Sequence, residues 1–561
     1  DTEERKIFEV ERKIHWILGS GNHSRTYIHH TESGELYQMP LAWYEDPERP
    51  GSGWWAMAPG FDRRFHLGVG RRVVRDCMVC HNAYPDVPAG NDAPGALQVY
   101  PTDLPEGIGC QRCHGPGAEH VRAALEGEMS FQELRGTIVN PAKLSPERRD
   151  DVCFSCHMQP SVAIPGVVRA DRGAYTFQPG DDLAAHRVYV DPVEVGRAQE
   201  DRFEINHHPY RLRQSRCYLE SGPAEMSCLT CHDPHRKVPR AQRAAHYRQA
   251  CLSCHTVDSC QLEEMADASA LKGSVAPDDC AGCHMPKRRT EDVVQVVMTD
   301  HLIQRRPGGP ELLAPLEESE PVIEDLIFLD PERAPAGAEG QIYRAMAVLQ
   351  VYSGDVDAVD FLQRQLAQTP QESVAPYLSL VRGQLGVDRP AAAADTARSI
   401  LQRDPDNPQA LDLLSVALAQ QGRTADAVDT LRRAIVLVPD DPSTRFNYGR
   451  ILFAAKQPEE ATKQLRRAVE LKPNLAIGWF YLGRIEAAAE RWGTAAEHYR
   501  QALVVEPSFD RAYLGLAEML QKTGDRTEAE RVLRHGSTHA RDTRAVKAAL
   551  GELLAAETAG S

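Results

Sequence analysis

Beyond residue 340, hydrophobic and polar positions recur with a period of 34 residues. A large apolar residue followed by glycine, as in Tyr448-Gly449, supplies packing positions for one helix of each repeat. Alanines at the same interval, such as Ala427 and Ala461, supply them for the next helix. Each unit closes on a proline, at Pro405, Pro439, Pro473 and Pro507. The pattern therefore predicts successive pairs of helices over the C-terminal part of the chain.

A period of 34 is typical of tetratricopeptide repeats, which stack into a solenoid whose concave face commonly binds a partner. The pattern is strong over residues 376–543 and weaker over 341–372, and residues 544–556 predict a capping helix. We therefore expect an α-solenoid over residues 341–561 that docks a protein partner or another copy of this chain. A purely structural or oligomerisation arm is the alternative.

The remaining chain predicts little regular structure. Residues 1–70 contain aromatic, alternating runs at 37–44 and 54–57 separated by a turn-rich segment, which predicts a small β element. The irregular spacing of motifs over residues 71–305 predicts only short helices there. Residues 306–340 are rich in Pro, Glu and Gly and predict a linker, in which the apolar run 322–329 suits one strand. The fold class is thus mainly α. We expect a domain over residues 71–305 to which the β-containing segment 1–70 belongs, a linker over 306–340 and a repeat domain over 341–561.

The pattern Cys-x-x-Cys-His occurs six times between residues 77 and 284. Zinc sites rarely demand a His after every second Cys, and a disulfide framework would not require one at all. Each copy is instead typical of covalent haem attachment, in which two thiols on one face of a helical turn bond the porphyrin and the His lies beneath the iron. The predicted attachment residues are Cys77, Cys80, Cys110, Cys113, Cys153, Cys156, Cys228, Cys231, Cys251, Cys254, Cys280 and Cys283. The predicted proximal ligands are His81, His114, His157, His232, His255 and His284.

Six haem c groups would supply much of the apolar material around which residues 71–305 condense. Of the 14 Cys, Cys217 and Cys260 lie outside the motifs and either pair with each other or stay as thiols. No Cys-x-x-Cys-Lys variant occurs, so a Lys-ligated catalytic haem has no candidate.

Twelve His outside the motifs precede residue 305, more than enough to fill six distal positions. His120 follows His114 by six residues, and His235 follows His232 by three. Such short tethers cannot reach the other face of the same iron, so these two side chains are expected to ligate neighbouring haems. The predicted distal ligands are His23, His29, His120, His207, His235 and His301. Their competitors are the adjacent His30 and His208, with His15, His66, His186 and His246 in reserve.

The chain also resembles a known family through two motifs, Cys-x-x-Cys-His-Gly-Pro-Gly-x-x-His at 110–120 and Cys-x-x-Cys-His-x-Pro-His at 228–235. Both are similar to those of multihaem cytochromes c related to the tetrahaem cytochrome of ammonia oxidisers and to hydroxylamine oxidoreductase. The resemblance implies mostly bis-His ligation, with an occasional five-coordinate haem marking a substrate site. Related repeat fusions often begin with a further haem segment, so this chain is either a shorter variant or lacks an upstream part.

Composition and charge narrow the function. The 561 residues are 42% hydrophobic and 26% charged, as in soluble globular proteins, and no apolar run is long enough to predict a transmembrane segment. A formal net charge of −16 argues against nucleic acid as a partner and favours a redox partner protein. Because haem is attached covalently outside the cytoplasm, we expect a removed export signal and a periplasmic or extracellular location.

The sequence thus predicts an exported electron-transfer cytochrome rather than an enzyme. The alternative is a multihaem oxidoreductase that acts on a small nitrogen or sulfur compound at a five-coordinate haem. A third possibility is an assembly scaffold in which the repeats are the primary functional part.

The first prediction concerns the number of haems. The intact mass of the mature protein should exceed that of its polypeptide by six haems, because each motif provides both thiols. Mass spectrometry of a fully matured sample that shows five or fewer haems would contradict this number.

Overall fold

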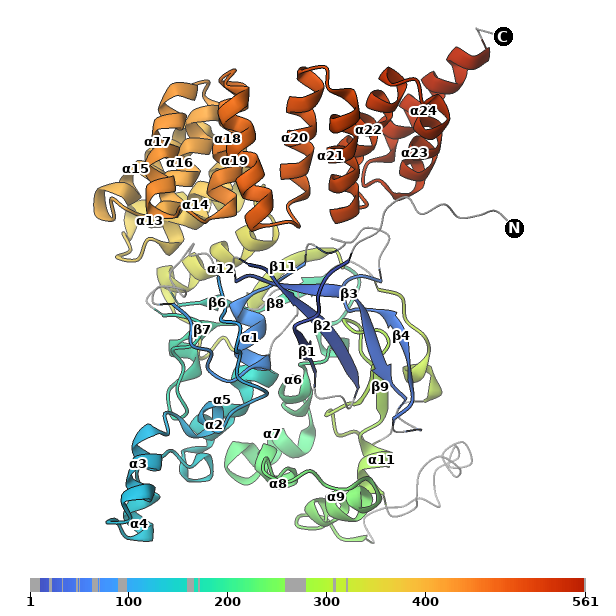
Figure 1. Ribbon diagram of the computed structural model, residues 1–561. Coiled ribbons are helices and arrows are strands. Elements are labelled where there is room, and N and C mark those ends of the chain that lie inside the picture. The colour runs from blue at the N-terminus through green and yellow to red at the C-terminus, as the bar shows by residue number, and fades with distance from the viewer. Residues whose placement is uncertain are drawn as a thin grey trace. The chain divides into compact units, whose positions relative to one another are not determined.

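The structure is a computed structural model that describes residues 11–19, 23–32, 34–46, 49, 51–62, 69, 71–88, 98–158, 166–169, 172–257, 279–305, 309–318 and 321–558. The chain separates into two compact units (Figure 1). The first consists of the described parts of Asp1–Cys77, Pro85–Leu104 and Ala336–Ser561. The second consists of those of Met78–Tyr84 and Pro105–Pro335.

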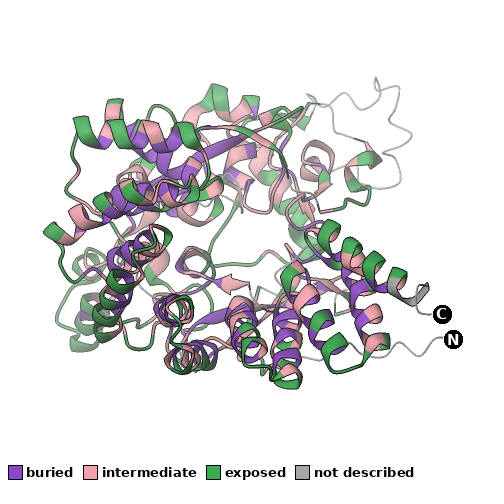
Figure 2. Ribbon diagram, turned by 90° about the horizontal axis from the view of Figure 1, so that it is seen from above, coloured by how far each residue is buried: buried purple, intermediate pink, exposed green. Residues whose placement is uncertain are grey.

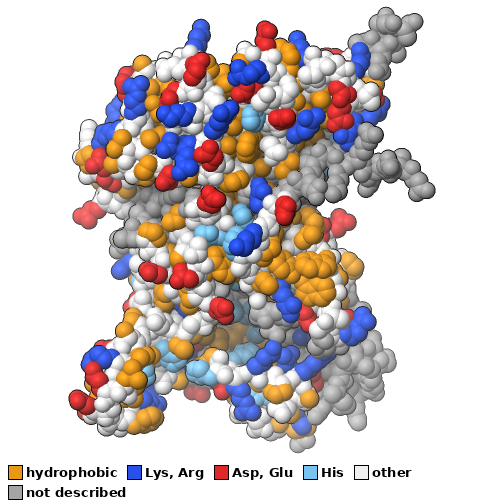
Figure 3. Space-filling view, viewed as in Figure 1, with side chains coloured by type: hydrophobic (Ala, Val, Ile, Leu, Met, Phe, Trp, Pro, Cys, Tyr) orange, Lys and Arg blue, Asp and Glu red, His pale blue; other side chains and the backbone are white. Residues whose placement is uncertain are grey.

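An antiparallel sheet opens the first unit. Its described strands are β1 (Trp16–Leu18), β2 (Ser24–His30), β3 (Leu36–Glu45), β4 (Gly53–Met57) and β5 (Arg72–Val73), in the order β1-β2-β3-β4 with β5 paired to β3. The predicted β element is therefore confirmed. Tyr37 and Tyr44 of β3 are buried, whereas Trp54 and Trp55 on the edge strand β4 are exposed. Figure 3 shows an apolar patch over this edge of the sheet. The Trp55 ring stacks on that of Tyr27 at 5.4 Å.

Paired helices form the rest of the first unit and confirm the predicted tetratricopeptide solenoid. Figure 2 shows their buried faces turned toward one another. In five successive repeats, the turn between the two helices contains a residue with positive φ. These residues recur every 34 positions and are Asp388, Gly422, Lys456, Glu490 and Gly524. The helices are α12 (Gly337–Val351), α13 (Val356–Gln368), α14 (Ala375–Gly386), α15 (Pro390–Arg403), α16 (Pro408–Gln420), α17 (Thr424–Leu437), α18 (Pro442–Ala454), α19 (Pro458–Leu471), α20 (Ala476–Ala488), α21 (Trp492–Val505), α22 (Asp510–Lys522), α23 (Arg526–His539) and α24 (Thr543–Thr558).

The sheet and the repeats contact each other within the first unit. Asn474, in the turn between α19 and α20, donates from Nδ2 to the Val69 carbonyl at 2.6 Å. In the same turn, the Lys472 ammonium lies 5.7 Å from the centre of the Tyr37 ring. The sheet thus clusters with the repeats, whereas the sequence placed residues 1–70 with the motif region. The predicted division into four domains stays a prediction.

The second unit has short elements, as the sequence predicted. Its helices are α2 (Gln111–His114), α3 (Ala118–Glu126), α4 (Phe131–Leu134), α5 (Pro146–His157), α6 (His208–Leu212), α7 (Arg216–Glu225), α8 (Cys228–Cys231), α9 (Arg243–Cys251) and α11 (Cys280–His284), and α1 (Arg75–His81) ends in it. Two-stranded ladders join β6 (Val167–Val168) to β7 (Arg187–Val188), β9 (Lys287–Arg289) to β10 (Val297–Thr299) and β8 (Val190–Glu194) to β11 (Ile323–Phe328). The last pairs the apolar run of the predicted linker with a strand more than 100 residues away.

Much of the interior of the second unit is ionic. Arg202 is 1% exposed and contacts the carboxylates of Asp191, Glu194 and Glu204. A smaller apolar cluster gathers Phe154, Met158, Leu183 and Tyr189. Among the residues that the structure describes, no helix is long and apolar enough to cross a membrane.

Candidate haem centre

The cysteines of the motifs lie on or beside short helices. Helix α5 begins with the Ser145 hydroxyl accepting from the Arg148 amide and ends at His157. Helix α11 begins with the Asp279 carboxylate accepting from the Gly282 amide and ends at His284. Cysteines three residues apart in a helix share one face. The following His is the last helical residue in α1, α2, α5 and α11, whereas His232 lies just beyond α8 and the fifth motif runs out of the end of α9. The local geometry that haem attachment requires is therefore present.

Thiols of different motifs are neighbours in the second unit. The thiols of Cys80 and Cys156 lie close enough to interact, as do those of Cys153 and Cys228. Cys113 interacts electrostatically with Cys153 and Cys156. These contacts join the motifs at 77–81, 110–114, 153–157 and 228–232.

The last two motifs continue the series. Cys251 interacts with Cys231 of the fourth motif and with Cys280 of the sixth. Cys217 also lies near Cys231, and Cys260 lies outside the described residues. All six motifs are therefore linked in one series of neighbouring cysteines, in which the motif at 153–157 interacts with three others.

A small cavity of about 30 Å³ lies where three motifs meet. Val79, Arg112 and Ser155, each from the middle of a different motif, line it together with Phe177 and Tyr189. The Arg112 guanidinium is held 4.4 Å above the Tyr84 ring, at the same cavity. The Arg112 and Arg187 guanidiniums here suit the carboxylates of a haem, and the paired cysteines with a following His are the donor set that covalent haem requires, so the chemistry of the residues present fits haem.

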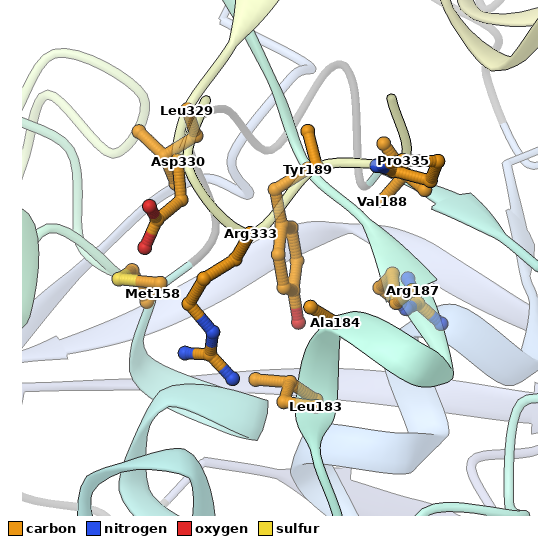
Figure 4. Close-up of a pocket in the computed structure, with 11 residues that line it drawn as sticks. Met158, Leu183, Ala184, Arg187, Val188, Tyr189, Leu329, Asp330, Arg333 and Pro335 are labelled. Carbon is orange, nitrogen blue, oxygen red and sulfur yellow. The ribbon is translucent and has the colours of Figure 1, made fainter. Parts of the chain in front are cut away.

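A neighbouring small cavity of about 30 Å³ lies beyond the end of α5 (Figure 4). Met158, which directly follows His157, lines it with Tyr189 and Leu329. The Arg333 side chain points into the cavity, and its guanidinium binds the carboxylates of Asp151 and Asp182 at 2.7 and 2.6 Å. Because this cation is already neutralised, the second cavity offers mainly apolar contact.

Proximal histidines meet histidines from distant parts of the chain. The His114 ring lies parallel to that of His235, with 5.8 Å between their centres. The His157 ring lies 5.6 Å from that of His208, and the His232 ring lies 6.2 Å from that of His301. Figure 3 shows histidine side chains gathered on this part of the molecule. Three proximal ligands are thus each beside a candidate second ligand within the described residues.

Hydrogen bonds set which ring nitrogen is available to a metal. A backbone carbonyl only accepts, so a ring nitrogen bonded to one must carry the proton. Nδ1 donates in this way from His114 to Val139 at 2.7 Å and from His284 to Gln304 at 2.7 Å. Nε2 of both proximal histidines therefore keeps its lone pair for iron, as in other metal-ligating histidines.

Four predicted distal histidines share this arrangement, and His207 is one of them, with Nδ1 donating to the Arg202 carbonyl at 3.5 Å. Nδ1 donates from His29 to the Lys13 carbonyl at 2.9 Å, from His120 to that of Leu134 at 3.1 Å and from His301 to that of Thr299 at 3.1 Å. Burial lowers the pKa of His301 to about 4 and also lowers that of His29. Those two imidazoles are thus neutral at pH 7, as a metal ligand must be.

Four reserve or competing histidines have the wrong nitrogen engaged. Nε2 of His30 and of His246 donates to the carbonyls of Tyr100 and Cys231. Nε2 of His186 contacts Asp181, and Nδ1 of His15 accepts from the His30 amide, which leaves the proton of a neutral His15 on Nε2. These side chains are therefore poor iron ligands in this fold.

His207 and His208 lie in different surroundings although they are adjacent. His207 is fully buried, with its ring 4.9 Å from that of Tyr210. His208 lies between His157 and His301, and its buried Nδ1 has no hydrogen-bond partner among the described residues. Burial also lowers the pKa of His208 well below its usual range. A buried imidazole nitrogen without a partner is itself a sign of a missing metal or cofactor.

The other predicted histidines are less constrained. His235 is 76% exposed apart from its contact with His114, and His23 lies exposed at the start of β2. His66 lies outside the described residues.

A buried ion pair fixes the segments that carry His208 and His301. Arg211 on α6 binds Asp300 through two parallel contacts, Nε to Oδ1 at 2.9 Å and Nη2 to Oδ2 at 2.8 Å. The two side chains are 3% and 1% exposed. Ser215 reinforces this link by donating to the His301 carbonyl at 3.3 Å. The rings of His208 and His301 are consequently held 4.5 Å apart.

Comparison with known proteins agrees with these observations. Family models described as "Tetratricopeptide repeat" match residues 378–442, 418–477 and 486–553. A model described as "Doubled CXXCH motif" matches residues 222–259, which hold the fourth and fifth motifs. The multiheme cytochrome MtrA of Shewanella baltica (strain OS185) is 24% identical over 204 residues, which are 35% of this chain and 56% of that protein. The chain is a multihaem c-type cytochrome fused to tetratricopeptide repeats.

The cytochrome thus spans about half the length of this curated relative. It is also similar to solved structures. PilF of Pseudomonas aeruginosa is 19% identical, with 36% of this chain and 90% of that chain covered and a TM-score of 0.31. MamA from Desulfovibrio magneticus RS-1 is 21% identical, with 28% and 89% covered and a TM-score of 0.26. Covalent haem c follows from the motifs and this relationship, and the number of six stays a prediction.

The second prediction concerns the Arg211–Asp300 pair. Arg211→Leu should lower the free energy of unfolding of the holoprotein by about 3–5 kcal/mol, because it leaves a buried carboxylate without its main partner. Arg216→Leu is the control, since Arg216 is 89% exposed in its pair with Glu220 and should matter by less than about 1 kcal/mol. Denaturant titration followed by haem absorbance measures both variants. Equal losses would show that the buried pair contributes no more than a surface pair.

Proposed function

We propose that this cytochrome is an exported electron-transfer protein with six haems of mostly bis-His ligation. Each bound haem would take up and release one electron at its iron. The observation that carries the proposal is the approach of His235, His208 and His301 to three proximal histidines. An iron ligated on both faces has no position for a substrate, which favours electron transfer over catalysis.

The contiguous motifs support the same proposal. Thiol contacts run from the first motif through the third, fourth and fifth to the sixth, with the second beside the third. Haems attached in such a series would be neighbours, as transfer between them requires. Covalent attachment outside the cytoplasm supports export to the periplasm or the cell exterior.

We assign the distal ligands from the geometry. His235 is proposed for the haem of His114, as its short tether to a neighbouring motif implied. His208 is proposed for the haem of His157 in place of the predicted His207. The His208 ring lies 5.6 Å from that of His157, whereas the His207 ring lies 4.9 Å from that of Tyr210. His301 is proposed for the haem of His232, and His29 and His120 remain distal candidates by their free Nε2.

We also propose that the repeats dock a protein partner or another copy of this chain. Phe446 of α18 and Tyr481 of α20 contact each other at 5.6 Å, and the Arg484 guanidinium lies 5.3 Å from the Tyr481 ring. In the described part of the chain, no carboxylate forms an ion pair with Arg484 or with Arg450, its equivalent one repeat earlier. Several arginines of the second helices are instead paired, as in Arg432–Asp429 and Arg467–Asp440. The first helices therefore offer aromatic and positive groups for contact.

The third prediction tests electron transfer and ligation. The oxidised and reduced holoprotein should show low-spin haem spectra and rapid reduction and reoxidation, without turnover of hydroxylamine, nitrite or tetrathionate. A high-spin haem whose spectrum changes with one of these compounds would favour the oxidoreductase alternative.

Matched variants extend this test to single ligands. His208→Met and His235→Met should each raise the midpoint potential of one haem, because Met ligation raises the potential of a His-ligated iron. His207→Met and His246→Met are the controls and should leave the redox titration unchanged. A shift with His207→Met but none with His208→Met would reverse the assignment.

The fourth prediction concerns docking by the repeats. Arg450→Glu/Arg484→Glu should weaken self-association or partner binding by about tenfold or more, whereas Arg432→Glu/Arg467→Glu on the second helices should not. Analytical ultracentrifugation and binding titration measure the two. These point variants are preferable to deletion of residues 341–561, because deletion also removes the Asn474 and Lys472 contacts of the N-terminal sheet. Equal effects of both double variants would contradict a docking role for the first helices.

A further inference from the structure

A cationic segment stands out in this acidic chain. Residues 234–257 contain five Arg and Lys and no Asp or Glu, although the whole chain has a formal net charge of −16. The segment leads through α9 directly into the fifth motif, Cys251 to His255. The five cations are Arg236, Lys237, Arg240, Arg243 and Arg248.

The structure leaves much of this charge exposed. Arg236, Arg240 and Arg243 are exposed, and no described carboxylate forms an ion pair with any of the three. Arg243 donates from Nε to the Val238 carbonyl at 3.3 Å, which holds its charge in place without neutralising it. Figure 3 shows Lys and Arg side chains gathered over α9 and α11, with few acidic ones among them.

Lys287 of β9 extends the surface. It is exposed and donates to the Thr299 hydroxyl at 2.8 Å. Arg243 and Arg240 lie near enough for their charges to act on Lys287, and the Asp279 carboxylate at the start of α11 acts on it with the opposite sign. We call the surface formed by Arg236, Arg240, Arg243 and Lys287 the α9 basic surface. Its four cations face one carboxylate, Asp279, among the described groups that act on Lys287, so the surface keeps a net positive charge.

The α9 basic surface lies beside haem attachment residues that are themselves open to solvent. Cys254 and His255 are exposed, in contrast to the half-buried cysteines of the motif at 153–157. Helix α9 also packs against α11, which carries the sixth motif. A partner on this surface would therefore reach the end of the motif series that is joined through Cys251 and Cys280.

We propose that the α9 basic surface is the docking site of an acidic redox protein, at which electrons enter or leave the haem series. The proposal rests on the electron-transfer function proposed above. Attraction between an acidic partner and this one surface would orient the encounter, since the net negative charge of the chain repels the same partner elsewhere. The competing explanation is that these cations only neutralise the carboxylates of the bound haems.

The test uses the complete holoprotein and the triple variant Arg236→Glu/Arg240→Glu/Arg243→Glu. A matched control, Arg432→Glu/Arg534→Glu/Arg544→Glu, changes the formal charge by the same amount at exposed positions of the repeats. The first readout is binding to a carboxylate-bearing resin at pH 7 and low salt. Wild type and control should be retained despite their net negative charge, and the α9 variant should not.

The second readout is the stopped-flow rate at which the reduced protein is oxidised by ferricyanide, an anion, or by hexaammineruthenium(III), a cation. Each electron passed oxidises one haem iron from ferrous to ferric and reduces one ferricyanide to ferrocyanide. At low salt the α9 variant should react with ferricyanide about tenfold more slowly than wild type, and the difference should vanish near 1 M salt. The ruthenium complex should react no more slowly with the variant than with wild type.

The outcomes separate the explanations. An equal loss of resin binding and of ferricyanide rate in the control variant would show that only the net charge of the protein matters. That result would overturn the docking site. A normal ferricyanide rate in the α9 variant would overturn it directly. Loss of haem or altered haem spectra in that variant would assign the arginines to the haem carboxylates instead. If neither reagent oxidises the wild type, electron transfer itself fails, and this docking site fails with it.

Discussion

The approach of proximal imidazoles to histidines from distant parts of the chain is the interaction on which the haem region depends. Each approach is made by residues that have no local reason to meet: His114 with His235, His157 with His208 and His232 with His301. Carbonyl acceptors at Nδ1 fix the protonation of several rings and leave Nε2 for iron. Ligation would thus join segments that are far apart in sequence, as disulfides do in other small-element folds.

Buried ions hold these segments where side-chain packing is sparse. Arg211 and Asp300 connect the His208 and His301 segments, and Arg202 gathers three carboxylates nearby. Such groups are costly to desolvate and repay that cost only with complete hydrogen bonding. Their directional geometry suits a region whose function requires fixed rings, whereas an apolar interior would allow the rings more freedom. Buried ion pairs therefore fix the segments of the second unit, whereas burial of apolar side chains stabilises the repeats.

Charge is also distributed differently on the two units. The second helices of the repeats pair most of their arginines with carboxylates three or four residues away or in the preceding turn. The α9 basic surface and the first-helix arginines Arg450 and Arg484 lack such partners among the described residues. Ion pairs on the surface contribute little to stability. Arginines without such a pair are therefore the ones whose charge is available to bind a partner. They give the cytochrome two different surfaces for recognition.

The sequence alone determined the features that depend on residues close together in the chain. Haem attachment needs two thiols and a His within one helical turn, and a solenoid needs only its 34-residue period, so both could be predicted without a structure. The strand at 323–328 was also predictable from its apolar run, but its pairing with Val190–Glu194 was not. Tertiary structure alone decided that the N-terminal sheet clusters with the repeats, through contacts such as Asn474 to Val69. It also distinguished His208 from His207, since adjacent residues at the start of a helix face different directions and only the fold shows which one meets His157.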